Sequence, residues 1–462
     1  MNWRWLAATG ALHVLLAGAL SLVFIRELGW GAHAAVSVSL LVPLLLAAFP
    51  LLRRNGSGLP ARGVLLVVLG AGLLSRALLV AVPPSPEADI HRMIWEGRVP
   101  SVGGDPYRHA PDDPELTELA AALPETYGGV NYWKLPAIYP PAAQLFFRVT
   151  TAVSVHPSAM KTALVLVEGF LVLALVLLLR RRGLPVGLVV LYVWNPLPLT
   201  EIAGGGHVDA LGVALLGLGI LAAESARPAA ASCLSALSAL SKIVGGVLLP
   251  FLLFPGRREA RRPLRVLLAA LGTTALVTAP FLTPGLLDRG LVARLGEMTG
   301  SLWLFARHWR FNESGFLLFD AVFGEYGRFA VLAFVAALLG ILLYRRVEPA
   351  LALPLLAGAV FLLSPVAHPW YFLWTLPFMV LHPERRVLLA ATLALSGTLV
   401  FAYWAPWNVP AGEPWFLPWP VRLAEFLPAG LILAGGGVLN LVRRLVACGQ
   451  SDVSTENGEA PG

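Results

Sequence analysis

The chain has 462 residues, of which 57% are hydrophobic and only 13% are charged, whereas a soluble globular domain usually has about 25% charged residues. Most of the arginines behind its net charge of +7 stand at the ends of apolar runs, as in membrane proteins, so the charge does not indicate a nucleic-acid partner. Cys233 and Cys448 lie far apart and predict neither a disulfide framework nor a metal motif.

Apolar runs of about 17–25 residues recur along the whole chain, which is typical of helices that cross a bilayer. We therefore predict an all-α polytopic membrane protein of about 12 transmembrane helices, with short broken or re-entrant helices and a large first extracytoplasmic loop that carries juxtamembrane helices. No convincing small-residue cleavage site follows the first run, so we interpret it as a span and not as a signal peptide. The spans are expected near 5–25, 34–52, 63–83, 159–179, 184–201, 207–223, 264–282, 327–344, 349–364, 370–383, 387–404 and 424–442.

Six basic clusters define the topology, because the positive-inside rule places them together in the cytoplasm. They are Arg53-Arg54, Arg180-Arg181-Arg182, 256–262, Arg345-Arg346, 384–386 and Arg443-Arg444. A single crossing by the run 228–254 would carry the third cluster outside. Lys242 in the middle of this run and the pair Gly245-Gly246 favour a broken helix that enters and returns, which is tolerated where the backbone lines a cavity.

With this topology, three polar segments share the outer face, at 84–158, 283–326 and 405–422. The third is rich in Trp and Pro, and Trp at this depth is more typical of an interfacial anchor than of a ligand site. We predict one membrane domain, 1–446, followed by a disordered cytoplasmic tail, 447–462. No internal repeat is visible, which disfavours a secondary transporter.

The first outer segment opens with an unusual concentration of polar groups, in PEADIHRMIWEGRVPSVGGDPY. Helical spacing places Asp89, Arg92 and Met93 on one face of a helix that we expect to lie along the membrane surface. A turn-rich stretch follows, and YPPAAQ, with Tyr139 and Gln144, leads back to the membrane. A long structured loop of this kind is usually functional.

Several charged residues lie within apolar runs, where a charge is costly and indicates a function. Lys242 is the first of these, and Glu168 is expected to pair with it or to join two helices. Arg76 is expected to extend outward to the membrane surface. His207 and Asp209 open a span; two such residues do not make a metal site, but a helix N-terminus there would favour a phosphate.

Further polar residues are expected on the outer side. Arg307, His308 and Arg310 form a basic cluster, and His368 precedes an aromatic stretch at the end of a span. Each of these residues has an interfacial or structural interpretation beside a role in binding phosphate or sugar.

Several short blocks of this sequence resemble those of a known family in their order and spacing. They are DIHRMIWEG, GGDPY, YPPAAQ, WNPLPLTEIAGGGHVDAL, LSALSKIVGGVLLPFLL, WRFNESGF and SPVAHPWYFLWTLPF. This order is similar to that of the GT-C superfamily of integral membrane glycosyltransferases, which use polyprenyl-phosphate sugars, and is closest to bacterial branches that include mannosyltransferases. The resemblance implies a multi-pass enzyme of the bacterial cytoplasmic membrane, with its active site on the extracytoplasmic side.

The resemblance also implies roles for individual residues. The Asp of the first outer loop is the catalytic base in this family, and Asp89 occupies that position. Ala88 separates Asp89 from Glu87, which stays open as the alternative base. Donor contacts are expected from Lys242, His207, Asp209, Arg307, Arg310, Asn312, His368 and Tyr371. Acceptor contacts are expected from Glu87, Arg92, Tyr107, Tyr139 and Gln144.

The chemistry is consistent with this assignment. Transfer from a sugar phosphate needs a base for the acceptor hydroxyl but no strong general acid, because phosphate is a good leaving group. A glycosidase would instead need two carboxylates that flank the bond. We therefore predict inverting single-displacement transfer of a sugar from a polyprenyl-phosphate carrier, with mannose favoured by the resemblance alone.

The remaining partners are left open. The acceptor is a glycolipid, a glycan or a protein, and membrane lipid surrounds the enzyme. No cofactor is assigned, although a divalent cation stays open, and no nucleotide-binding loop is visible. The alternatives are a transporter or flippase for a lipid-linked sugar and a non-enzymatic membrane scaffold.

Overall fold

The structure, a computed structural model, describes residues 2–52, 58–85, 89–254, 262–410 and 413–456. Across these residues the regular structure is helical, and extended pairing is limited to one parallel bridge between Phe311 and Val366. Glu87 and the basic residues Arg53 and Arg54 lie outside the described residues, so the predictions made for them are not tested.

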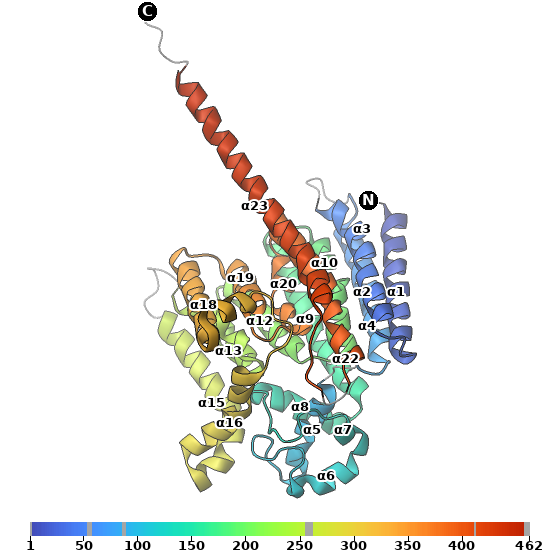
Figure 1. The fold of residues 1–462 in the computed structure, drawn as a ribbon, viewed down its shortest axis with the longest axis vertical. Coiled ribbons are helices and arrows are strands. Elements are labelled where there is room, and N and C mark those ends of the chain that lie inside the picture. Colours follow the sequence, from blue (N-terminus) through green and yellow to red (C-terminus); the bar gives the residue numbers. More distant parts are fainter. Residues whose placement is uncertain (1, 53–57, 86–88, 255–261, 411–412, 457–462) are drawn as a thin grey trace, which may run out of the picture.

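The first half of the chain contains an N-terminal helix group, the first outer segment and a central group (Figure 1). The N-terminal group is α1 (Trp3–Ile25), α2 (Trp30–Ser39), α3 (Leu41–Leu51) and α4 (Ala61–Val80). The outer segment is α5 (Ile90–Arg98), η1 (Val99–Val102), η2 (Pro114–Leu116), α6 (Thr117–Ala122), α7 (Pro124–Gly128) and α8 (Pro141–Val153). The central group is α9 (Pro157–Arg181), η3 (Val186–Val189), α10 (Val190–Val193), α11 (Pro196–Pro198), η4 (Leu199–Gly204) and α12 (Asp209–Glu224).

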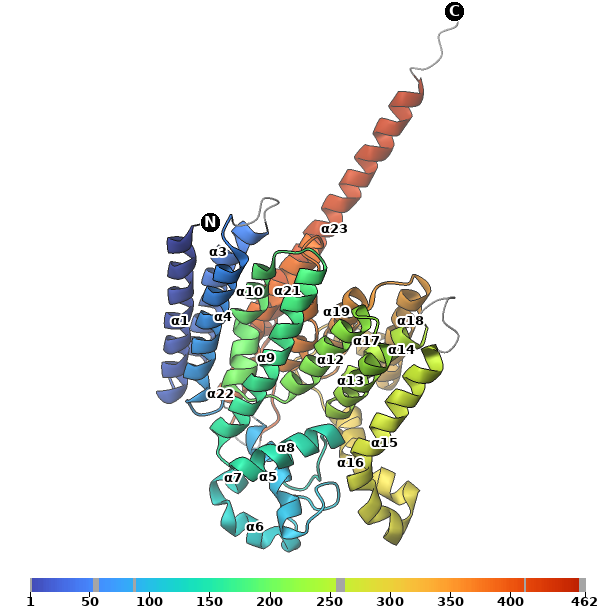
Figure 2. The same cartoon turned by 180° about the vertical axis from the view of Figure 1, so that it is seen from behind.

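The part of the second half from 228 to 363 lies on the other side of the central group, whereas the part from 386 to 408 also contacts α2 (Figures 1 and 2). The second half begins with α13 (Pro228–Ser241), η5 (Ile243–Leu248), α14 (Leu249–Leu253), α15 (Arg262–Arg289), α16 (Leu291–His308) and α17 (Phe316–Phe323). It continues with η6 (Gly324–Tyr326), α18 (Gly327–Tyr344), α19 (Pro349–Leu363), η7 (Pro369–Trp374) and α20 (Leu376–Met379). It ends with α21 (Arg386–Thr398), η8 (Leu399–Tyr403), α22 (Trp404–Asn408) and α23 (Trp419–Glu456).

Seven helical stretches of the described chain are long and apolar enough to cross a membrane, and a pair bent by 55° makes an eighth if it is one span. The seven are Trp3–Ile25, Trp30–Leu51, Ala61–Val80, Pro157–Arg181, Pro263–Arg289, Phe316–Tyr344 and Arg386–Asn408, and the bent pair is Val186–Val193 with Pro196–Gly204. These helices confirm the all-α polytopic class. They do not confirm about 12 spans, because several of the expected spans consist of shorter helices.

The run 228–254 has the break that the sequence predicts. α13 ends at Ser241, Lys242 is extended with φ −158° and ψ 129°, and the chain continues as the 3-10 helix η5. Two serine side chains of α13 hold this region: the Ser235 hydroxyl donates to Gly245 O in η5 (3.1 Å), and the Ser238 hydroxyl donates to Gly212 O of the helix α12 (2.6 Å). The Ser235 bond supplies a local donor to the irregular backbone of η5, as such backbone needs within an apolar bundle.

The first outer segment covers one end of the bundle, opposite the N-terminus (Figure 1). It has a small core of its own, made of Trp95, Val99, Leu116, Leu119 and Val130. α5 crosses α8 closely at Gly97, where a Cβ atom would come within 2.7 Å of Phe147 O, so a side chain there would separate the helices. The chain returns through α8 into α9, which spans the bundle.

The other end of α9 carries a predicted basic cluster. Arg182 pairs there with Glu224 at the end of α12 (2.5 Å) and with Glu348 just before α19 (3.1 Å). The first outer segment and this basic turn therefore lie at opposite ends of the bundle.

A buried ion pair joins α4 to α9. The Arg76 guanidinium donates from Nε and Nη2 to the two carboxylate oxygens of Glu168, both at 2.7 Å, and from Nη1 to Val193 O at 2.8 Å. The expectation that Arg76 extends outward is therefore wrong, and of the two alternatives for Glu168 the pairing with Lys242 is wrong, whereas the joining of two helices is confirmed. Arg76 lies on α4, which packs beside α9, and its planar guanidinium presents two parallel N–H groups that match the two oxygens of the Glu168 carboxylate.

The C-terminal helix α23 runs without interruption from Trp419 to Glu456 and extends beyond the rest of the bundle (Figure 1). The structure describes helix as far as Glu456, and the predicted disorder of the tail 447–462 stays a prediction. The last residues, 457–462, lie outside the described part of the chain.

Replacing Glu168 by Ala leaves the buried Arg76 charge unpaired and is expected to destabilise the protein by about 3–5 kcal/mol. The double variant Arg76→Met/Glu168→Leu removes both charges and is expected to recover much of that loss. Thermal unfolding in detergent measures both effects. Glu224→Ala, which removes a partly exposed carboxylate, serves as the control with a loss below about 1 kcal/mol. A Glu168→Ala protein as stable as wild type would contradict the assignment.

Candidate active site

A cavity of about 480 Å³ lies where the outer segments meet the membrane helices, and its size is typical of a ligand site. The first outer segment contributes Asp89, Arg92, Asn131, Tyr132 and Tyr139 to its wall. The region of α16 contributes Ser301, Leu302, Phe305 and Trp309. η5 and α19 contribute Ile243, Val244, Ala357, Val360 and Phe361, next to Lys242. The segment after α19 contributes Ser364, His368, Trp370, Tyr371 and Trp374, and the third outer segment contributes Trp415.

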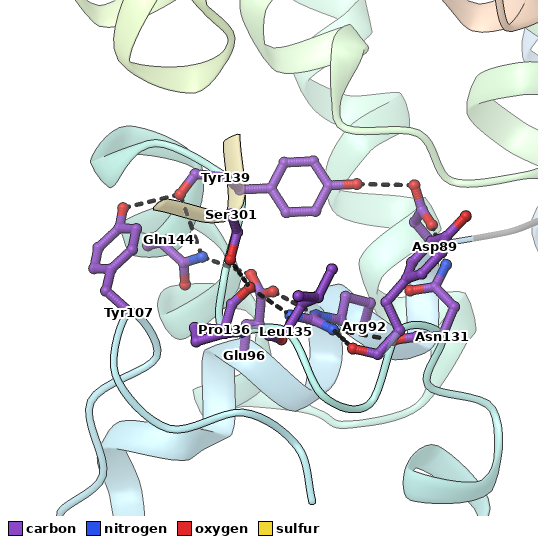
Figure 3. Close-up of polar contacts among 11 residues, drawn as sticks. Asp89, Arg92, Glu96, Tyr107, Asn131, Leu135, Pro136, Tyr139, Gln144 and Ser301 are labelled. Atoms are coloured by element: carbon purple, nitrogen blue, oxygen red, sulfur yellow. Dashed lines mark hydrogen bonds and ion pairs between the residues drawn. The ribbon is translucent and has the colours of Figure 1, made fainter. Parts of the chain in front are cut away.

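Asp89 is held by two hydrogen bonds at the start of α5 (Figure 3). The side-chain amide of Asn131 donates to Oδ1 (2.6 Å), and the Tyr139 hydroxyl donates to Oδ2 (3.0 Å). The carboxylate does not cap the helix. Because an ionised carboxylate has about four lone-pair positions, both oxygens can still accept a further hydrogen bond.

Arg92, one turn further along α5, organises the loop that carries Asn131 (Figure 3). Its Nε donates to Glu96 Oε1 (2.6 Å), and Nη1 donates to the carbonyls of Asn131 (3.0 Å) and Tyr132 (3.1 Å). Its Nη2 donates to the carbonyls of Leu135 (2.5 Å) and Pro136 (2.9 Å). All five N–H groups of the guanidinium are thus used within the chain, and Arg92 acts on the loop 131–136.

A second set of hydrogen bonds, on the buried side of the cavity wall, supports Tyr139. The Gln144 amide donates to Glu96 Oε2 (2.6 Å), and the Tyr107 hydroxyl donates to Tyr139 O (2.8 Å). Burial raises the pKa of the Glu96 carboxyl, against the opposing charge of Arg92. Burial, together with the negative charge of Asp89, raises the pKa of Tyr139 well above its ordinary value, so the phenol stays protonated and can donate to Asp89.

These contacts place the residues predicted to bind the acceptor. Tyr139 and Arg92 lie in the cavity wall, where they hold Asp89 and its neighbouring loop. Tyr107 and Gln144 are buried behind that wall, only 1% and 2% exposed, and they hold Tyr139 and Glu96 in place.

Lys242 faces the same cavity from η5. Its ammonium binds both carboxylate oxygens of Asp209, at 2.8 and 2.7 Å, and lies 4.1 Å from the centre of the Tyr371 ring. The indole N–H of Trp374 also donates to Asp209 Oδ1 (2.6 Å). Asp209 is 1% exposed, whereas the Lys242 side chain is 23% exposed. The cation therefore reaches the cavity, and the carboxylate holds it from behind.

The two histidines predicted at the donor site are joined by a stack of rings. His207 stacks on Trp370 with ring centres 3.8 Å apart, and Trp370 stacks on His368 at 4.3 Å. His368 lines the cavity and also stacks on Phe311 at 4.8 Å. His207 is 2% exposed and lies at the buried end of the stack, beside Glu201.

The basic cluster of the second outer segment has structural contacts. Arg310 pairs with Glu313 and with Asp320 (2.8 Å). The Asn312 amide, 1% exposed, donates to Ala367 O (3.1 Å) and to Glu425 (2.7 Å). Arg307 and His308 are exposed at the end of α16, and neither is among the described residues that line the cavity.

Two residues that hold the predicted site groups, Asn131 and Trp374, were missed by the sequence analysis. Asn131 is one polar residue in a loop and becomes notable only when that loop folds over Asp89. Trp374 belongs to an aromatic stretch that was interpreted as part of a span. Among the residues that the structure describes, no group of three His, Cys, Asp or Glu side chains could hold a metal ion, and the question of a divalent cation stays open.

The chain was compared with known families and with curated proteins. Residues 5–255 match the family described as "Alpha-(1->6)-mannopyranosyltransferase, N-terminal domain", and this match spans more than half of the chain. No curated protein matches the chain. The chain therefore belongs to this family of mannosyltransferases and is a glycosyltransferase, as the sequence predicts.

The five hydrogen bonds of Arg92 predict that even a change to Lys, which keeps the positive charge, affects the loop 131–136. Lys has three N–H donors and cannot serve the five acceptors of Arg92, so Arg92→Lys is expected to loosen the loop 131–136 and to lower kcat. Hydrogen exchange of the amides in 131–137 is expected to become faster. Arg98→Lys on the same helix is the matched control and should leave exchange unchanged. Equal exchange rates in both variants would show that Arg92 does not hold the loop.

Proposed function

We propose that this mannosyltransferase moves mannose from a polyprenyl-phosphate carrier to an acceptor hydroxyl, in an inverting single displacement with Asp89 as the base. The observation that carries this proposal is one cavity that brings together an oriented carboxylate, a lysine and an apolar wall. These are the three groups that such a reaction needs: a base for the hydroxyl, a cation for the phosphate and a surface for the lipid.

Asp89 is the base in this scheme. It accepts the proton of the acceptor hydroxyl while that oxygen forms a bond to C1 of mannose on the face opposite the phosphate. The bond from C1 to the phosphate oxygen breaks at the same time, and its electron pair leaves with the phosphate. Asn131 and Tyr139 hold the carboxylate in position and keep the base from rotating during the transfer.

Lys242 binds the phosphate. Its ammonium balances the charge that develops on the leaving group, and Asp209 and the Tyr371 ring hold it at the cavity wall. His368, which lines the same cavity, is the second donor contact. We assign Asp209 and His207 to the support of these groups, because both are buried behind the wall.

The apolar wall supports a lipid carrier. Ile243, Val244, Ala357 and Val360 line the cavity beside Lys242, and Ile243 is 59% exposed on the surface of the bundle. The first units of a polyprenyl chain would therefore lie along η5 and α19 while the phosphate contacts Lys242. A donor that arrives within the membrane explains why the cavity opens among apolar helices.

The charge distribution supports a location of the site on the outer face of the membrane. The cavity lies under the first outer segment, at the end of the bundle opposite the basic turn around Arg182. The positive-inside rule places that turn in the cytoplasm and the cavity outside.

The family description also bears on the product. An α linkage made with inversion requires a β-linked donor sugar, and a 1→6 linkage is a bond to the primary hydroxyl of a hexose. We therefore propose a glycan or glycolipid acceptor that ends in a hexose. The transporter and scaffold alternatives are disfavoured, because the family consists of enzymes.

Asp89→Asn is expected to lower kcat by about 10²–10⁴-fold, because the amide cannot accept the proton. Purified protein in lipid is given a labelled polyprenyl-phosphate mannose and an α-mannoside acceptor, and donor binding is measured separately. Donor binding should be retained. Asp112→Asn, an exposed acid of the same outer segment, is the control and should be fully active. Full activity of Asp89→Asn would remove this residue from the role of base and point to Glu87.

Lys242→Gln is expected to weaken donor binding roughly 10- to 150-fold, the effect of about 1.5–3 kcal/mol for a lost charge-assisted contact. The KM of the acceptor should stay unchanged, because Lys242 contacts the donor phosphate alone. Lys134→Gln, on the exposed part of the first outer segment, is the matched control. An increase in acceptor KM without a change in donor binding would show that Lys242 contacts the acceptor and not the donor phosphate.

A further inference from the structure

Three aromatic residues from three separate outer segments meet in the cavity wall. Tyr132 comes from the first outer segment, Trp309 follows α16 in the second, and Trp415 belongs to the third. They are far apart in the sequence, yet all three line the same cavity.

Tyr132 and Trp309 form a direct contact. Their ring centres are 5.2 Å apart with the planes at 66°, and the indole N–H of Trp309 donates to the Tyr132 hydroxyl (3.1 Å). Tyr132 has a φ of 50°, a left-handed conformation that is rare for a large side chain and that clusters at functional sites. The carbonyl of Tyr132 is held by Arg92, which helps to maintain this conformation.

The position of this pair relative to Asp89 is defined by the chain. Asn131, which donates to Asp89, directly precedes Tyr132, so the aromatic pair lies next to the base. Lys242 and the apolar wall come from η5 and α19, which are different elements of the cavity. We therefore assign these rings to the acceptor, which must reach Asp89, and the wall of η5 and α19 to the donor.

Trp415 completes the surface and differs from other outer tryptophans. Its ring packs on Phe311 with centres 5.6 Å apart, in the same apolar cluster as Trp309. Trp303 and Trp419 also lie in outer segments, but they are 65% and 64% exposed and are not among the cavity-lining residues. Trp303 and Trp419 therefore fit the interfacial role that is usual for Trp, whereas Trp309 and Trp415 face the site.

We propose that Tyr132, Trp309 and Trp415 form a binding site for a pyranose ring of the acceptor glycan. A pyranose presents patches of C–H groups that pack on aromatic faces, while its hydroxyls remain solvated or hydrogen-bonded. This inference rests on the proposed function, because it takes Asp89 to be the base that receives the acceptor hydroxyl. It assigns the acceptor to a saccharide and places its rings on three residues, two of which lie outside the family match at 5–255.

The competing explanation is that the rings only fasten the outer segments together. A structural role would change stability and affect donor and acceptor alike, whereas a saccharide site changes acceptor affinity selectively. The site also predicts that a longer acceptor binds more tightly than a shorter one, because additional pyranose rings reach the aromatic surface.

The test uses the full chain in lipid nanodiscs with octyl α-mannosides of one, two and three sugars as acceptors. Trp309→Ala and Trp415→Ala are each expected to raise the acceptor KM about tenfold and to remove the advantage of the longer acceptors, with donor KM and kcat unchanged. Trp309→Phe keeps a ring but loses the N–H that donates to the Tyr132 hydroxyl, so it is expected to raise the acceptor KM clearly less than Trp309→Ala does. Trp303→Ala, an exposed tryptophan of α16, is the matched control and should not change any constant.

A second measurement needs no donor. In saturation-transfer NMR, the aromatic protons of the protein are saturated, and the signal appears on those C–H protons of methyl α-mannoside that lie against them. This signal is expected in wild type and in Trp303→Ala but not in the double variant Trp309→Ala/Trp415→Ala. Equal signals in all proteins, with unchanged acceptor KM, would overturn the proposal. The same acceptor KM in Trp309→Phe and Trp309→Ala, both raised, would also overturn it, because the ring would not be the cause. If wild type does not use a polyprenyl-phosphate mannose, the proposed function fails, and the mannoside signal still decides on this site.

Discussion

The candidate active site depends on the hydrogen bonds that the Arg92 guanidinium donates to Glu96 and to the loop 131–136. The guanidinium is buried on a nine-residue helix and directs all its donors at Glu96 and at four carbonyls of the loop 131–136. The loop in turn presents Asn131 to Asp89, Tyr132 to Trp309, and Pro136 O to the Ser301 hydroxyl. One cation thus converts a segment without regular structure into a rigid wall, because each exposed carbonyl would otherwise need a donor that the cavity does not supply.

The membrane part of the site follows a second constraint. Backbone groups at membrane depth must be satisfied within the protein, so irregular backbone persists there only where side chains or a cavity compensate for it. η5, with Lys242 before it, and η7 are two such stretches, and both line the cavity. The departure from long helices that reduces the number of clear spans is therefore also what brings Lys242 and Tyr371 to the site.

The two buried carboxylates that pair with cations show where sequence reasoning succeeded and where it failed. A mid-run lysine is costly without a partner, and this argument identified Lys242 correctly as a residue with a specific environment. The suggested pairing of Lys242 with Glu168 was wrong, because Glu168 binds Arg76 and Asp209 binds Lys242, whereas the alternative that Glu168 joins two helices was right. Hydropathy indicates how deep in the membrane a charged residue lies, but it does not identify the residue's neighbour. The neighbour depends on which helices pack together, and contacts between residues far apart in the chain decide that.

The sequence by itself determined the helical membrane class, the polar outer segments, the break near Lys242 and the family, because apolar length, basic clusters and ordered motifs are local properties. It also singled out Asp89, Lys242, His368 and Tyr371, which the structure places in one cavity wall. Only the tertiary structure decided that Tyr107, Gln144 and Asp209 lie behind that wall, that Asn131 holds Asp89, and that Tyr132, Trp309 and Trp415 line one cavity. The physical reason is that a side chain becomes a ligand or a support according to the direction in which it points after packing, and nonlocal contacts set that direction.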